Sequence, residues 1–129
     1  MKAEQLTASL ENCQKLVGLG VTVDSYFFHV RHIGLRSEHV THDHPLTLSP
    51  AFEITAPAPT LSELLEVAKR WEFVFYNTTR DLNLFRGCLF VGDNEIETES
   101  TNPANALILC IIEAIKEGHI TAKQINGGE

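Results

Sequence analysis

The segment 103–117 constrains the fold most, because its side chains are apolar around nearly the whole circumference of a helix. Asn102 and Pro103 predict the helix start, since Asn is a preferred N-cap and Pro is favoured at the first helical position. Gly118 predicts its end. A helix of this composition must be covered on more than one side. We therefore expect a sheet to cover one side, and the segment 4–17 or a second subunit to cover another.

A capped helix and three strands are predicted before this apolar helix. Thr60 and Glu63 have the spacing of a capping box, which predicts a helix over 61–70. Composition and turn residues predict strands at 72–78, 84–91 and 95–99. The middle strand has apolar residues at both odd and even positions, and therefore on both of its faces, so it should be central in the sheet. The order α-β-β-β-α predicts an α+β fold with a three- or four-stranded antiparallel sheet and helices packed on one face.

The N-terminal part is less regular. Leu6, Leu10, Cys13 and Val17 fall on one face of a predicted helix 4–17. After this helix we expect an extended segment at 21–30, a loop at 34–45 and an edge strand at 46–54. We expect a single domain over 1–129. Its parts are an N-terminal helix with an irregular or extended segment (1–55), a compact α-β-β-β-α unit (56–118) and a flexible tail (119–129).

Charge and hydropathy exclude several function classes. The chain has 10 basic and 17 acidic residues, a net charge of −7, which argues against binding nucleic acid or anionic membranes. The α-β-β-β-α order is also that of double-stranded-RNA-binding domains, but those present basic residues where the second helix begins. Here Glu97 and Glu99 precede that helix. With no apolar segment long enough to span a bilayer, no signal peptide and no disulfide framework, we expect a cytoplasmic protein without membrane contact.

Histidine is the one unusual concentration of chemistry-bearing residues. His29, His32, His42 and His44, with His39 among them, are candidate metal ligands, because imidazoles beside carboxylates suit Zn²⁺ or Ni²⁺. The first two would share a face of a helix, and the last two would share a face of a strand. The spacing matches no zinc signature. The sequence therefore favours polar histidines exposed on a loop, without a resident cofactor. Such histidines would bind Ni²⁺ only adventitiously.

The other reactive side chains favour structural roles. Glu95, Glu97 and Glu99 point to one side of their strand, which is typical of a solvated edge that resists pairing. Cys88 lies within a strand, which favours a buried, inert thiol. The aromatic residues Trp71, Phe73 and Tyr76 favour the core rather than a ligand platform. No phosphate-binding glycine motif is present, and no catalytic residue is identified.

The stretch 56–65 (APAPTLSELL), followed by 102–107 (NPANAL), resembles a group of small uncharacterised proteins encoded by bacteriophages and prophages. That resemblance implies no activity and no site residues. We expect a small soluble accessory or interaction protein, not an enzyme, that acts through protein–protein contacts as a homodimer or with an unidentified protein partner. A dimer should bury the helix 104–116 or the region of Phe27 and Phe28. The alternative is a metal-binding module or metal-dependent enzyme that uses the histidine cluster at 29–44.

Overall fold

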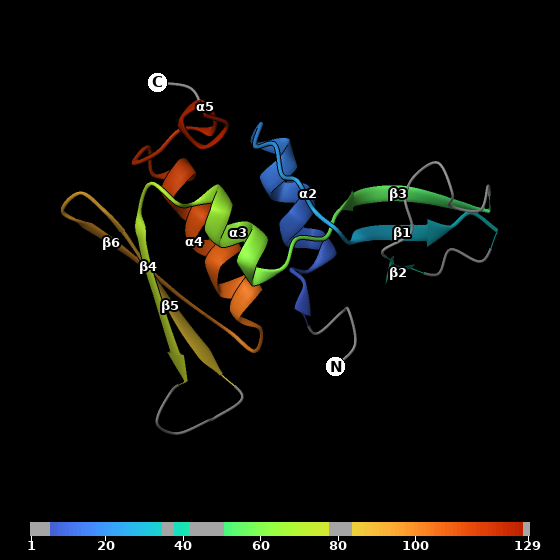
Figure 1. Ribbon diagram of the computed structural model, residues 1–129, viewed down its shortest axis with the longest axis horizontal. Coiled ribbons are helices and arrows are strands. Elements are labelled where there is room, and N and C mark those ends of the chain that lie inside the picture. The colour runs from blue at the N-terminus through green and yellow to red at the C-terminus, as the bar shows by residue number, and fades with distance from the viewer. Residues whose placement is uncertain (1–5, 35–37, 42–50, 78–83, 128–129) are drawn as a thin grey trace.

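The computed structural model describes residues 6–34, 38–41, 51–77 and 84–127. Within these residues the chain has an α+β fold with two separate three-stranded antiparallel sheets and four helices. Figure 1 shows helix α4 (Pro103–Lys116) with one sheet on one side and the other helices on the opposite side. The second sheet lies beyond helix α2, at the far end of the molecule. The predicted fold class is confirmed, although it did not include a second sheet.

Helix α4 is the centre of the core. The side chain of Asn102 accepts hydrogen bonds from the amides of Ala104 and Asn105, as expected of an N-cap. Gly118 follows the helix with a φ of 81°, a conformation that favours glycine. The helix packs on β5 and β6 on one side and on α2 and α3 on the other. The expectation of cover on several sides is thus met within one chain, and α4 needs no second subunit.

The sheet on α4 has the predicted strands in the predicted order. It consists of β4 (Glu72–Asn77), β5 (Phe85–Val91) and β6 (Asn94–Ser100), with β5 in the centre as expected. Helix α3 (Leu61–Val67) begins at the predicted capping box of Thr60 and Glu63. It ends three residues earlier than predicted and packs on α4.

Helix α2 (Leu10–Gly18) is shorter than the predicted helix 4–17. The hydroxyl of Ser9 caps it by accepting from the amide of Asn12, because Ser9 is extended and Thr7 forms a β-bridge with Thr60. The buried side chains of α2 are Cys13 and Leu16, whereas Val17 is exposed. Leu6 is exposed as well. The predicted apolar face is therefore wrong at its first and last residues, Leu6 and Val17.

The second sheet has the order β2-β1-β3, formed by β1 (Phe28–His32), β2 (Glu38–Thr41) and β3 (Phe52–Pro57). The loop predicted at 34–45 is wrong for 38–41, which pair with β1. Strand β2 pairs with the strand directly before it in the sequence, and the turn-forming residues Gly34, Asp43 and Pro45 on either side of so short a strand led to the prediction of one continuous loop. Of the edge strand predicted at 46–54, residues 52–54 lie in β3 and 46–50 are outside the described residues.

The segment expected to be a flexible tail contains the short helix α5 (Ala122–Ile125). Thr121 and Gln124 form a second capping box, and Ile120 is buried in the core. The side chain of Asn126 accepts from the amide of Thr22 and donates to the carbonyl of Gly20. Residues 119–127 are thus tied to the end of α2, while the expected division of the chain into 1–55, 56–118 and 119–129 remains a prediction. Among the four helices described, none combines the length and the hydropathy that a membrane crossing requires.

Candidate functional site

The structure separates the two candidate ligands on β1. His29 is buried, and its Nε2 lies 2.8 Å from the carbonyl oxygen of Ala8, next to a cavity of about 290 Å³. His32 is three positions further along the strand, so its side chain points to the opposite face. There it meets Phe52 edge-on, with ring centroids 5.0 Å apart. His29 and His32 would share one face only in a helix, and they lie in a strand instead.

The remaining histidines give no assembled metal centre in the described part of the chain. His39 on β2 contacts Phe52 edge-on, with centroids 5.1 Å apart, so His32 and His39 share an aromatic partner. Across the placed residues, no three His, Cys, Asp or Glu side chains are grouped so that they could hold a metal ion. His42 and His44 lie outside the described residues. The metal site proposed from the sequence therefore stays a prediction that depends on those two.

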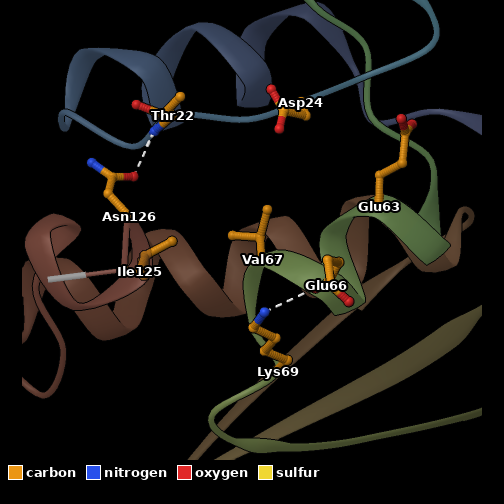
Figure 2. A pocket seen from close by; sticks show the side chains of 9 residues that line it. Thr22, Asp24, Glu63, Glu66, Val67, Lys69, Ile125 and Asn126 are labelled. Atoms are coloured by element: carbon orange, nitrogen blue, oxygen red, sulfur yellow. Dashed lines mark hydrogen bonds and ion pairs between the residues drawn. The ribbon is translucent and has the colours of Figure 1, made fainter.

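An open pocket of about 450 Å³ lies where the segment after α2, helix α3 and helix α5 meet (Figure 2). Its wall includes three carboxylates, of Asp24, Glu63 and Glu66. Glu63 accepts from the amides of Thr60 and Tyr26, and Glu66 pairs with Lys69 at 3.0 Å. Glu63 thus ties α3 to the segment after α2, whereas the exposed pair of Glu66 and Lys69 is local to the end of α3. The pocket is a junction between elements and carries no arrangement of groups aimed at a ligand.

All three cysteines are buried, as predicted for Cys88. Burial raises the pKa of the Cys13 thiol to about 12 and that of Cys110 to about 11. The pKa of Cys88 is also raised, first by burial and then by the charges of Glu97 and Glu95. Thiolates at neutral pH are therefore disfavoured at all three positions, which argues against a nucleophilic role.

The sheet on α4 leaves one face uncovered. Figure 1 shows that no described helix or strand lies over the side of β4, β5 and β6 that faces away from α4. We call this side the outer face. Strand alternation and register place nine residues on it: Glu72, Val74, Tyr76, Arg86, Cys88, Phe90, Glu95, Glu97 and Glu99.

The β6 edge of this sheet is charged. Glu95, Glu97 and Glu99 are exposed, which confirms the solvated edge predicted from the sequence. The Arg86 guanidinium on β5 pairs with Glu97 at 2.9 Å and with Glu99. Hydrogen bonds with Glu99 and Tyr76 raise the pKa of Arg86. Three carboxylates along one edge oppose the addition of another strand there.

The β4 edge has the opposite character. Val74, Phe75 and Tyr76 are consecutive, large and apolar, with 44%, 41% and 47% of their surface exposed. Val74 and Tyr76 belong to the outer face, whereas Phe75 lies on the α4 side, near Phe73 and Phe85. The prediction that Tyr76 belongs to the core is wrong, because Tyr76 lies on the outer face, which no described helix or strand covers (Figure 1). Among the described strands, β4 therefore pairs with β5 alone, and this sheet edge carries apolar side chains on both faces.

No family model matches the chain, and no curated protein or solved structure is significantly similar to it.

Proposed function

We propose that this chain is an interaction protein that binds a polypeptide strand along the β4 edge of its sheet. The observation that carries the proposal is the run of three exposed apolar residues, Val74 to Tyr76, on an edge strand. Natural sheets usually protect such an edge with charges, Pro, bulges or a covering element. An exposed apolar edge that lacks this protection is typical of a contact surface.

Strand addition explains why both faces of β4 are apolar. An added strand pairs with the backbone of the edge strand and also places its side chains beside those of the edge strand on both faces of the sheet. Val74 and Tyr76 offer that contact on the outer face, and Phe75 offers it on the α4 side. Contact through protein surfaces, rather than catalysis, is the activity that this arrangement supports. An origin in a bacteriophage or prophage stays a prediction.

The proposal is tested by site-specific photo-crosslinking in the native cell. A benzophenone amino acid in place of Tyr76 on β4 should give covalent protein adducts after illumination. The same group in place of Glu95, which is equally exposed but on β6, should give none. Excess unlabelled wild-type chain should suppress the β4 adducts, whereas excess Val74→Lys chain should not, because a lysine on an edge strand opposes pairing.

Equal adducts from the two edges, or none from β4, would contradict the proposal. So would suppression by the Val74→Lys chain as strong as that by the wild type.

A further inference from the structure

We propose that the strand bound at the β4 edge is β4 of a second copy of this chain, so that two molecules form a two-fold dimer with a continuous six-stranded sheet. This inference rests on the proposed function and names its partner. It also moves the dimer contact away from the two regions favoured by the sequence. Helix α4 is covered within its own chain, and Phe28 is the first residue of β1 in the other sheet, with Phe27 directly before it.

The pattern of the edge strands identifies the partner. A strand that pairs with β4 must present apolar side chains to both faces, because β4 is apolar on both. The other described edge strands, β2, β3 and β6, each alternate charged or polar residues with apolar ones or carry charge along one face. Only β4, with the sequence EFVFYN, has apolar residues on both faces with a single charge at its start. The strand most complementary to β4 within this chain is therefore β4 itself.

A two-fold axis gives this pairing a specific register. Residues opposite each other in an antiparallel pair lie on the same face, so a symmetric pairing can be centred on Phe75. Phe75 then faces Phe75 of the second copy on the α4 side. Val74 faces Tyr76 of the second copy on the outer face, and this pair occurs twice. All three exposed apolar residues are covered at once, which no register centred further from Phe75 achieves.

The charge distribution is compatible with this contact despite the net charge of −7. Glu72, at the first position of β4, falls at the outer ends of the paired segment. The carboxylates of Glu95, Glu97 and Glu99 lie on β6, two strands from the interface, or about 10 Å, so salt screens much of their repulsion. These same carboxylates form both outer edges of the six-stranded sheet. They oppose further strand addition, so that assembly stops at two chains.

The test is the mass of the full-length chain in solution, by light scattering and sedimentation over a range of concentrations. We expect the mass of two chains, with a Kd below about 100 µM. The double variant Val74→Lys/Tyr76→Lys sets lysines directly opposite each other at two positions and removes the apolar contact. Its Kd should rise by at least about 100-fold. Glu95→Lys, an exposed substitution on the other edge strand, is the matched control and should leave the dimer intact.

A charge-swap experiment separates loss of pairing from loss of folding. The Val74→Glu/Tyr76→Glu chain should be monomeric alone. Mixed with the lysine double variant, it should form a heterodimer, because each lysine then faces a glutamate. Failure of the mixture to pair, or a dimer that survives the lysine substitutions, would overturn the inference. A chain that is monomeric at every concentration would overturn it as well. In that case, β4 adducts with a different protein in the crosslinking experiment would still support the proposed function, whereas the absence of adducts would remove both.

Discussion

The two edges of the sheet on α4 differ in a way that sets the direction in which this protein can pair. The β6 edge carries Glu95, Glu97 and Glu99, all exposed, and a cation on β5 satisfies two of them. The β4 edge carries Val74, Phe75 and Tyr76, also exposed, with no charge among them. Both strands pair with the same central strand, β5, which packs on α4. The difference between the edges is therefore one of side chains, not of backbone.

The comparison shows that the charges along an edge strand decide whether adding another strand there is favourable or unfavourable. Carboxylates on β6 must be desolvated and brought near other groups if a strand is added, which is unfavourable. Apolar side chains on β4 lose exposed surface when a strand is added, which is favourable. A sheet with one edge of each kind can accept one further sheet and then stops.

The largest effect is expected in helix α4, because it packs on β5, the central strand that pairs with both edge strands. Leu107 in α4 is completely buried, and Leu107→Ala should lower the free energy of unfolding by about 3 kcal/mol through lost burial and the cavity left behind. Urea denaturation measures this, and amide exchange should rise in β4 and β6 together. Leu65→Ala, at an exposed leucine of α3, is the control and should cost less than about 1 kcal/mol. Faster exchange in only one edge strand would show that the edges do not share this support.

A smaller effect should fall mainly on one edge. A Cβ at Gly87 in β5 would lie 2.9 Å from Cζ of Phe73 and 3.1 Å from Cβ of Ala106. Gly87→Val should therefore displace the Phe73 ring of β4 and destabilise the fold by about 1–3 kcal/mol through overpacking. Amide chemical shifts should change more in β4 than in β6. Cys88→Val, next to it on the outer face, is the control, and larger shift changes in β6 than in β4 would contradict the assignment.

The smallest effect tests how far the charge of the β6 edge extends. Burial raises the pKa of Cys88 most, and the negative charge of Glu97 raises it further. Glu97→Gln removes that charge, so the pKa should fall and more thiolate should be present at a given pH. Labelling of Cys88 at pH 8 should become about two- to threefold faster.

An uncharged change on the other edge, Phe75→Leu, lies on the α4 side of the sheet, away from Cys88, and should leave this labelling rate unchanged. Cys13, with a pKa of about 12, and Cys110, with a pKa of about 11, should stay unlabelled in the folded chain of both variants. Equal acceleration by the two substitutions would mean that local opening, rather than charge, controls the reactivity of Cys88.

Much of the compact α-β-β-β-α unit could be predicted because its signals are local. The capping residues Thr60 and Asn102, the composition of the three strands and the apolar circumference of α4 act within a few residues of the structure they specify. The same kind of signal was present at Thr121 and Gln124, whose capping-box spacing marks α5 in the segment expected to be a tail. Strand β2 had only a weak signal, because it is four residues long and only Val40 and Thr41 are of types favoured in strands, so its pairing with the preceding strand β1 decides its conformation.

The candidate site was predicted only in part. The closed β6 edge follows from charge alternation along one strand and is confirmed. The open β4 edge could not be distinguished from a buried strand, because aromatic and β-branched residues are favoured in both places. The histidine pair failed for a related reason: His29 and His32 share a face in a helix, but they lie on opposite faces of β1.

The amino-acid sequence by itself determined the α+β class, the order of elements from Thr60 to Lys116 and the need of α4 for cover on several sides. These properties depend on capping, periodicity and composition, which act locally along the chain. Only the tertiary structure decided which elements provide that cover. Val74 and Tyr76 are exposed because no described element covers the outer face, and Phe75 is exposed because α3 packs on α4 instead of on β4. Exposure depends on the packing of segments distant in sequence, and no local pattern records it.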